Sequence, residues 1–452
     1  MPSPFLDFDS PEFHDLLTRL GFEDLKKAKK NLRLLSGEDR HHQAFNAIFP
    51  QLIESLAATP DPDMALNGLE RFAGSVIDRS FLFSLFRDSR KVLDLSLAIF
   101  SQSEYLTDIL VRHPQFFEWL LEPGLLRRPK VREELYQELS AMVDPLSTLD
   151  KKISALRRFK KREVLRIGLQ EILGNLDLST VTAELSNLAD VTLEKALEFS
   201  EVELRKRHGK PMYTDSIGKL QECRFCIIGM GKLGGEELNF SSDIDLIYLY
   251  TAEGETTGIK GPRGETTGII TNHQYYAKLA EMIGRAIGEQ TADGHVFRID
   301  LRLRPEGRAG DVASSIRSYE LYYESWGQTW ERQALIKARP VAGDVSLGRE
   351  FLRVCSPFVY RKYLDYSAIS EINDMNEQIN LSVSMDKKAH RHVKLGYGGI
   401  REIEFIVQAF QLLHGGQNPW IREANTLRAL HRLVEQKYLS YEDYSALLKA
   451  YT

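Results

Sequence analysis

The stretch over residues 224–250 constrains the fold more than any other, because a glycine-rich turn joins two apolar segments within it. It reads RFCIIGMGKLGGEELNFSSDIDLIYLY, which predicts a strand, a turn and a second strand that carries Asp243 and Asp245. Side chains alternate along a strand, so both carboxylates should share one face. Two adjacent acids repel each other and lose hydration when buried. A divalent cation relieves both costs, and Mg²⁺ typically binds one or two carboxylates together with substrate phosphates.

The turn between the two strands contains Gly229, Gly231, Gly234 and Gly235. Glycines let backbone N–H groups approach a phosphate closely. A phosphate cradle beside a pair of metal-binding acids favours nucleotidyl or phosphoryl transfer.

The same turn admits a rival interpretation. Its GMGKLG sequence matches the G-x-G-x-x-G fingerprint of dinucleotide-binding folds, which would make the chain an NAD-binding oxidoreductase. That fold needs a full helix before its next strand, and only one or two helical turns fit before Phe240. A Walker A loop does not fit either, because Lys232 is followed by Leu233 rather than Ser or Thr.

A third carboxylate lies in residues 295–304, which read HVFRIDLRLR. Apolar residues occupy the odd positions from 297 to 303, whereas the even positions from 298 to 304 are Arg, Asp, Arg and Arg. This alternation predicts a half-buried strand. We expect Asp300 to complete a three-carboxylate metal site with Asp243 and Asp245. Arg302 and Arg304 would share its face, where guanidinium groups suit bidentate recognition of phosphate.

Gly-Gly, then Asp-x-Asp on a strand, then a third Asp on a later strand resembles the plan of the DNA polymerase β-like nucleotidyltransferases. More narrowly, the chain resembles the glutamine synthetase adenylyltransferase family, whose bifunctional enzymes add AMP to glutamine synthetase and remove it. The resemblance covers most of the chain and rests on four blocks: GMGKLGGEELNFSSDIDLIYLY (229–250), DGHVFRIDLRLRPEG (293–307), WERQALIKARPVAGD (330–344) and KLGYGGIREIEFIVQAFQLLHGG (394–416). The segment NFSSDIDL is similar to the sequence found in the amino-terminal unit of the family. That unit removes AMP.

The resemblance implies a Mg²⁺-dependent phosphorolysis, in which adenylyl-tyrosine on glutamine synthetase reacts with phosphate to give tyrosine and ADP. It implies that Asp243, Asp245 and Asp300 are catalytic and hold two Mg²⁺ ions. The residues expected to bind nucleotide or phosphate are Lys232, Gly234, Gly235, Ser241, Ser242, Arg302, Arg304, Lys337 and Arg339. The alternative within the family is the forward reaction, adenylylation of the tyrosine from ATP.

The expected partner is adenylylated glutamine synthetase, with a PII-type signalling protein as the regulator of a full-length family member. The net charge of −5 gives no sign of general nucleic-acid binding. No apolar run reaches the length of a membrane span, and the amino terminus does not read as a secretory signal. With only three cysteines and no second pair beside Cys223 and Cys226, we expect a reduced cytoplasmic protein without a zinc site.

We expect an α+β fold that is mostly helical, with a polymerase β-like core of mixed sheet and helices flanked by helical domains. The expected domains are a helical one at residues 1–211, the catalytic core at 212–344 and a helical region at 345–452. The last run, residues 441–452, has no helix stop signal, so we expect a fragment that is cut at its carboxyl end.

Two local expectations concern the catalytic core. Residues 254–268 contain GETTG twice and lack apolar periodicity, which predicts a mobile surface connection and favours a passive insertion over a lid that covers the substrate. Residues 319–339 read as one helix whose aromatic residues, Tyr322, Tyr323, Trp326 and Trp330, belong to the core rather than to an adenine-stacking site.

Overall fold

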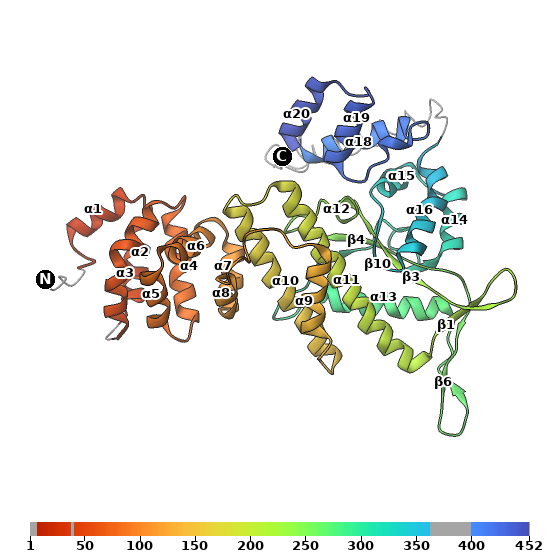
Figure 1. Cartoon of the computed structure of the whole chain (residues 1–452), viewed down its shortest axis with the longest axis horizontal. Coiled ribbons are helices and arrows are strands. Elements are labelled where there is room, and N and C mark those ends of the chain that lie inside the picture. The colour runs from red at the N-terminus through yellow and green to blue at the C-terminus, as the bar shows by residue number, and fades with distance from the viewer. Residues whose placement is uncertain (1–6, 38–39, 362–398, 452) are drawn as a thin grey trace. The chain divides into compact units, whose positions relative to one another are not determined.

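The computed structural model describes residues 7–37, 40–361 and 399–451, which form two compact units (Figure 1). Unit 1 runs to Pro129 and includes Lys161–Asp177, and unit 2 comprises Lys130–Lys160 and everything from Leu178 onward. Helix α10 (Leu149–Ile172) contributes residues to both. This division differs from the boundary expected at residue 211, because the long helix α11 (Leu178–His208) packs against the central sheet.

Apart from its part of α10, unit 1 is built from short helices. These are α1 (Pro11–Arg19), α2 (Leu25–Ser36), α3 (Arg40–Ala57), α4 (Pro62–Ser75), α5 (Arg79–Asp88), α6 (Arg90–Gln102), α7 (Glu104–Arg112) and α8 (Gln115–Leu120).

Aspartates that cap the amino ends of the helices explain why unit 1 breaks into short segments. The carboxylates of Asp24, Asp61 and Asp78 accept backbone N–H groups in the first turns of α2, α4 and α5. The core between these helices is rich in phenylalanine, and the Phe72 ring lies 5.6 Å from Phe100 and 5.1 Å from Phe117. These three helices therefore begin where an aspartate cap precedes an apolar face.

Unit 2 contains the sheet and the remaining helices. Its helices are α9 (Arg132–Val143), α11, α12 (Gly231–Gly234), α13 (Asn272–Gly288), α14 (Ile316–Ser325), α15 (Thr329–Ile336), α16 (Val345–Val359), α18 (Ile400–His414), the 3-10 helix η2 (Pro419–Ile421), α19 (Thr426–Glu435) and α20 (Tyr441–Tyr451). Its strands are β1 (Pro211–Thr214), β2 (Leu220–Glu222), β3 (Phe225–Met230), β4 (Ile244–Tyr250), β5 (Glu255–Thr256), β6 (Ile259–Lys260), β7 (Thr266–Thr267), β8 (Ile299–Asp300), β9 (Ala313–Ser315) and β10 (Arg339–Gly343).

The central sheet has the order β10-β3-β4-β8, and β9 also pairs with β4. Strands β3 and β4 are antiparallel, with Met230 opposite Asp245, and β10 is antiparallel to β3. Strands β8 and β9 run parallel to β4. This mixed sheet in a mostly helical chain confirms the expected α+β class.

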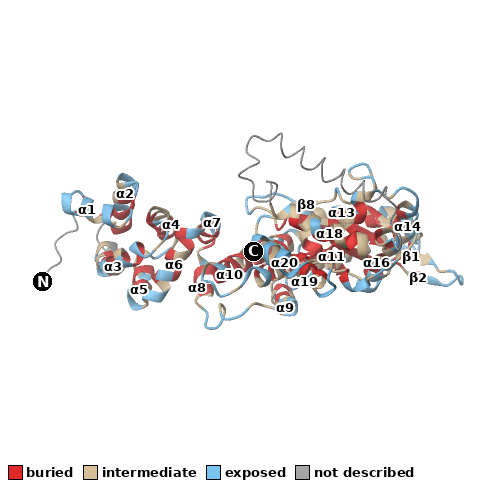
Figure 2. Ribbon diagram, turned by 90° about the horizontal axis from the view of Figure 1, so that it is seen from above, coloured by how far each residue is buried: buried red, intermediate tan, exposed pale blue. Residues whose placement is uncertain are grey.

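Helices cover both faces of the sheet. Residues Cys226, Ile228 and Met230 of β3 pack on one face with side chains from α14, α15 and α16. On the other face the Phe225 ring stacks 5.1 Å from the Tyr276 ring of α13. In Figure 2 the buried residues, drawn in red, lie along helices such as α11, α13 and α16. Both faces of β4 are therefore core, and its acidic end is the part that leaves the core.

The structure corrects two expected elements. Residues 295–304 do not form one strand, because only Ile299–Asp300 pairs with β4 and the chain then turns. Residues 319–339 do not form one helix either, since α14 ends at Ser325, α15 begins at Thr329 and Arg339 starts strand β10. Tyr323 is core as expected, but Trp326 at the break is 71% exposed and Trp330 is 38% exposed.

The duplicated GETTG segment contains short strands. The first copy supplies β5, which pairs with β1, and the second supplies β7, which pairs with β6 in a hairpin. Thr256 of the first copy is buried, whereas Thr266 and Thr267 of the second are exposed. The two copies therefore hold different positions despite their identical sequence.

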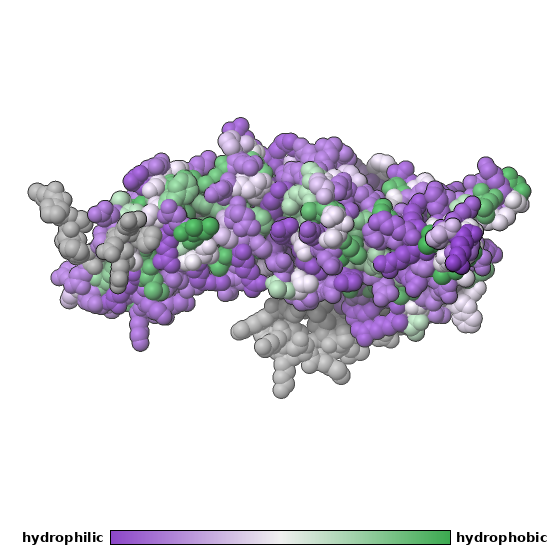
Figure 3. All heavy atoms as spheres, turned by 90° about the horizontal axis from the view of Figure 1, so that it is seen from below, coloured by the Kyte–Doolittle hydropathy of each residue, from purple (hydrophilic) through white to green (hydrophobic). Residues whose placement is uncertain are grey.

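Hydrophilic residues predominate on the face of the molecule seen in Figure 3, and hydrophobic ones occur there in small separate groups. Among the described residues, no helix is long and apolar enough to cross a membrane.

The first copy of GETTG should be the more sensitive to substitution. A Cβ at Gly254 would lie 2.1 Å from the carbonyl oxygen of Met212 in β1, so Gly254→Ala should lower the free energy of unfolding by about 1–3 kcal/mol. Gly284 of α13 has open space around its Cα, so Gly284→Ala should instead raise it by up to about 1 kcal/mol. Urea unfolding followed by circular dichroism compares the two, and equal midpoints would contradict the packing of Gly254 against β1.

Candidate functional site

Two of the three predicted aspartates meet at the end of the central sheet. Asp245 and Asp300 are register partners on the parallel strands β4 and β8. Asp243 lies one residue before β4 and is exposed. Gly231, at the start of α12, has a φ of +53°, and a Cβ there would lie 2.7 Å from Oδ2 of Asp245. The carboxylate of Asp245 therefore lies directly beside the glycine turn.

The geometry of the turn excludes the dinucleotide-binding alternative. That fold needs a full crossover helix between parallel strands. Here α12 spans only Gly231–Gly234, and the strands that it joins, β3 and β4, are antiparallel. The glycine fingerprint thus serves a turn between neighbouring antiparallel strands.

Arginines neutralise two of the three carboxylates. Nε of Arg298 donates to Oδ1 of Asp243 at 2.5 Å, and its guanidinium also donates to the carbonyl of Ser241 at 2.8 Å. Nε of Arg302 donates to both oxygens of Asp300, at 3.1 and 2.7 Å. The hydrogen bond from Arg302 lowers the pKa of the Asp300 carboxyl, and Asp300, Asp245 and Asp243 together raise the pKa of Arg302.

The expected three-carboxylate metal site is not assembled in this arrangement. Within residues 7–37, 40–361 and 399–451, no cluster of three or more His, Cys, Asp or Glu side chains is placed to hold a metal ion. The physical reason is that Asp243 and Asp300 are turned toward arginines. The donor set still suits a hard cation, since carboxylate oxygens are the ligands that Mg²⁺ prefers. The residues fit Mg²⁺ chemically, provided that the arginines give way.

The predicted phosphate cradle is divided between buried and exposed residues. Gly234 and Gly235 are buried, and a Cβ at Gly234 would lie 1.6 Å from the carbonyl oxygen of Lys337. Lys232 is half-buried and Ser241 is exposed, while the hydroxyl of Ser242 hydrogen-bonds to the side chain of Asn239. Gly234 is therefore required for close packing of the turn.

Lys337 lies in a buried ion-pair cluster behind the turn. Its Nζ donates to Oε2 of Glu237 at 2.5 Å, to Oγ1 of Thr426 at 3.0 Å and to Oε1 of Glu404 at 3.2 Å. Burial alone would lower the pKa of Lys337, but the carboxylates of Glu237 and Glu404 outweigh burial and raise it. The cluster ties the turn to α18 and α19 and leaves Lys337 no free donor for a phosphate.

Helix α19 also holds the turn directly. The side chain of Asn425 donates to the carbonyl of Gly235 at 3.0 Å, and Arg428 pairs with Glu236 at 2.8 Å. Glu236 has a φ of +58°, a conformation that is uncommon for residues other than glycine. The turn is therefore fixed from the side opposite to Asp245.

Arg339 is likewise part of a buried pair. Its guanidinium binds both oxygens of Asp190 on α11, at 2.6 and 3.1 Å, and donates to the carbonyl of Leu233 at 3.0 Å. Burial raises the pKa of Asp190 to about 6, although Arg339 and Arg132 oppose the shift. Arg339 supports the turn from behind instead of facing the acidic edge.

Arg304 is buried and bonded to the backbone. Its guanidinium donates to the carbonyls of Leu301, Arg308 and Gly310, with the shortest bond 2.7 Å long. Arg304 therefore stabilises the turn that follows β8. It does not take the expected position on the same face as Asp300.

Sequence reasoning missed several residues that shape the site. Glu236 and Glu237 follow the Gly-Gly pair immediately, which is a local signal that could have been used. Asp190 is an acid in the buried stripe of α11, and a charge at such a position calls for a partner. Arg298 lies in the alternating run that carries Asp300, but the sequence contains no signal that pairs it with Asp243.

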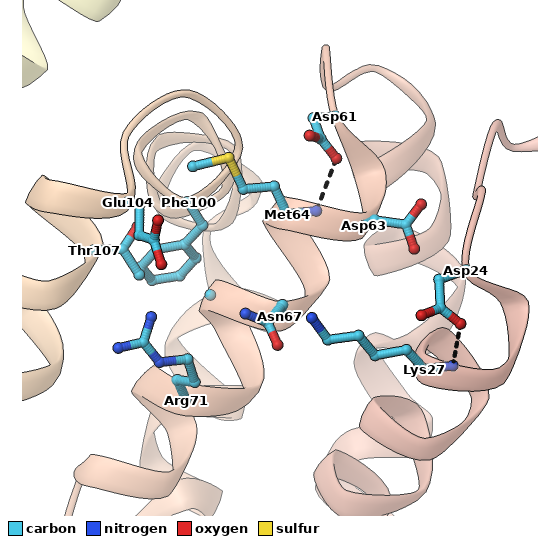
Figure 4. Close-up of a pocket in the computed structure, with 11 residues that line it drawn as sticks. Asp24, Lys27, Asp61, Asp63, Met64, Asn67, Arg71, Phe100, Glu104 and Thr107 are labelled. Carbon is cyan, nitrogen blue, oxygen red and sulfur yellow. Dashed lines mark hydrogen bonds between the residues drawn. The ribbon is translucent and has the colours of Figure 1, made fainter.

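A separate pocket lies in unit 1, among α2, α4, α6 and α7 (Figure 4). Three of its four acids have contacts within the unit: Asp24 and Asp61 cap helices, and Asp63 accepts the backbone N–H of Glu23 at 2.6 Å. Arg71 is paired with Asp108 at 2.5 Å. These contacts explain the polar lining as helix capping and ion pairing.

Comparisons with known proteins give a consistent family. Residues 94–354 match the family Glutamate-ammonia ligase adenylyltransferase, and residues 373–452 match GlnD PII-uridylyltransferase. The chain is 39% identical, over 78% of its length, to the bifunctional glutamine synthetase adenylyltransferase/adenylyl-removing enzyme of Thioalkalivibrio sulfidiphilus. It is 36% identical over 85% of its length to the protein of that description from Nitrosococcus oceani, and 37% over 82% to that from Pseudomonas aeruginosa. The matched parts are 35%, 38% and 36% of these relatives, so the chain spans little more than a third of their length.

Replacement of Arg304 by alanine should change the free energy of unfolding more than replacement of Arg302 does. Arg304→Ala removes the buried guanidinium that donates to the carbonyls of Leu301, Arg308 and Gly310, so we expect the free energy of unfolding to fall by about 1–3 kcal/mol. The guanidinium of Arg302 is exposed, so Arg302→Ala should change it by no more than about 0.5 kcal/mol. Chemical denaturation measures both, and a fully stable Arg304→Ala variant would show that the turn does not depend on this side chain.

Lys337→Met should be strongly destabilising, because it leaves Glu237 and Glu404 buried without their cation. Removal of one partner from a buried ion pair typically costs about 3–5 kcal/mol. Lys278→Met, at an exposed position of α13, is the matched control and should have little effect. Thermal unfolding of the two variants tests this, and similar melting temperatures would argue against the buried cluster.

Proposed function

Because this chain belongs to the glutamate-ammonia ligase adenylyltransferase family, we propose that its sheet-containing unit removes AMP from a tyrosine of glutamine synthetase by phosphorolysis. The observation that carries the proposal is the register pairing of Asp245 with Asp300 beside the glycine turn at Gly231. Oxygen ligands at one edge of a sheet, next to a turn built from glycines, suit a reaction at a phosphoryl group.

In the proposed reaction an oxygen of inorganic phosphate attacks the phosphorus of the adenylyl group. The bond from that phosphorus to the tyrosine oxygen breaks, which gives ADP and a phenolate that takes a proton from solvent. Free tyrosine has a pKa of about 10, so its phenolate is a workable leaving group. Phosphate is already anionic, so the attack needs no strong general base.

Asp243, Asp245 and Asp300 would hold Mg²⁺, which supplies charge neutralisation at the phosphoryl oxygens when bound. Arg302 has an exposed guanidinium at the same edge and would orient the phosphate. Gly231 lets the backbone of the turn lie close to Asp245, because a Cβ at this position would lie 2.7 Å from Oδ2 of Asp245. We assign Arg304, Lys337 and Arg339 to support of the site, because buried partners use their guanidinium or ammonium groups.

The direction of the reaction rests on the sequence alone. The segment NFSSDIDL at residues 239–246 resembles the sequence of the family unit that removes AMP. The relatives are described as carrying both activities, so adenylylation from ATP is the second candidate. We propose glutamine synthetase as the protein substrate. The match of residues 373–452 to GlnD PII-uridylyltransferase supports a PII-type protein as the regulator.

Product analysis distinguishes the two directions. The chain is incubated with adenylylated glutamine synthetase, Mg²⁺ and phosphate, and the nucleotide product is identified by chromatography. We expect ADP, and we expect no reaction when phosphate is omitted. AMP formed at the same rate without phosphate would mean hydrolysis, and adenylylation of the unmodified substrate from ATP would favour the forward reaction.

Loss of a carboxylate should abolish the reaction without unfolding the chain. Asp245→Asn removes a charge at the acidic edge, so turnover should fall by at least about a thousandfold. Relief of repulsion should keep the melting temperature unchanged or raise it slightly. Asp293→Asn, in the loop before β8, is the control and should keep full activity. A variant Asp245→Asn with near wild-type turnover under saturating Mg²⁺ would refute the assignment.

A further inference from the structure

The guanidinium of Arg302 lies at the centre of the acidic edge. It makes a forked ion pair with Asp300, in which an Nη atom reaches Oδ2 at 2.5 Å and Nε contacts both oxygens. The charges of Asp245 and Asp243 act on the same guanidinium. Arg302 therefore pairs directly with Asp300 and lies within electrostatic reach of the other two aspartates, of which Asp243 is paired with Arg298.

Exposure separates Arg302 from the buried cations around it. The Arg302 side chain is 64% exposed, whereas its partner Asp300 is 14% exposed. Lys337 and Arg304 are buried and have several partners each. Arg302 can therefore leave Asp300 by rotation into solvent, while the carboxylate stays in place.

We propose that Arg302 is the resident counter-cation of the acidic edge, which a divalent cation displaces and which then binds a phosphate group. This inference rests on the proposed metal-dependent function. A divalent cation and a guanidinium compete for the oxygens of Asp300, because like charges at that distance repel. The displaced guanidinium stays tethered two residues from Asp300, and its planar fork matches a phosphate.

The arrangement couples the two ligands. If phosphate holds Arg302 away from Asp300, it removes a competitor of the divalent cation, and the cation in turn frees Arg302 for phosphate. Binding free energies obey reciprocity, so each ligand should tighten the other by the same factor. A site without this exchange would show cation binding that is independent of the arginine.

The test measures Mn²⁺ binding by electron paramagnetic resonance, without turnover, in the wild-type chain, Arg302→Ala and Arg317→Ala. Arg317 is the matched control, because it is also exposed and forms an ion pair with Glu320 at 2.5 Å on α14. We expect Arg302→Ala to bind Mn²⁺ roughly three- to tenfold more tightly than wild type, and Arg317→Ala to bind as wild type does. Inorganic phosphate should tighten Mn²⁺ binding in the wild type and in Arg317→Ala, but not in Arg302→Ala.

Asp245→Asn distinguishes failure of this inference from failure of the proposed function. If Asp245→Asn abolishes Mn²⁺ binding but Arg302→Ala binds Mn²⁺ no more tightly than wild type, the counter-cation role is refuted and the metal site stands. If Mn²⁺ does not bind to the wild-type chain at all, both the metal site and the displacement are refuted. Tighter binding in Arg302→Ala with unchanged dependence on phosphate would refute the transfer of the guanidinium to phosphate.

Discussion

Mutual repulsion of carboxylates at the end of β4 is the constraint to which the rest of unit 2 responds. Asp245 and Asp300 are held opposite each other by parallel strand pairing, and Asp243 precedes Asp245 by two residues. Strand pairing fixes the positions of these side chains, so the charge must be balanced by cations that come to them. Exposed arginines provide that balance from the segment around β8. In such a site the strands hold the carboxylates in place, and the exposed arginines that balance their charge can be exchanged for other cations.

The glycine turn next to the acids is rigid for a different reason. Its backbone is packed so closely on the segment after α15 that Gly234 tolerates no side chain. Buried ion pairs through Lys337 and Arg339 then fix it to α18, α19 and α11. Buried pairs of this kind contribute little net stability, but they are costly to break and so favour one geometry. The site thus combines mobile surface cations on one side with immobile buried ones on the other.

The sequence predicted the local parts of this arrangement better than the distant ones. Strand, short turn and acid-bearing strand follow from alternation and glycine spacing over residues 224–250, and the third aspartate follows from a second alternating run. The roles of Arg304, Lys337 and Arg339 could not be read in the same way. Lys337 finds Glu404 67 residues away and Arg339 finds Asp190 149 residues away, so only the fold shows that these cations are already paired. Alternation also failed beyond Asp300, because Arg304 bonds to its own turn instead of extending the strand.

The order of strands in the central sheet has a consequence for synthesis of the chain. Strand β3 lies between β4 and β10, yet β10 is made more than a hundred residues later. Until residues 339–343 emerge, β3 is an edge strand with the sequence FCIIGM, which carries no charge and no proline. Unpaired apolar edges of this type are templates for association with other chains. The nascent protein therefore passes through a stage in which the apolar edge of β3 is unpaired, and a chaperone that covers β3 until β10 is made would prevent association with other chains.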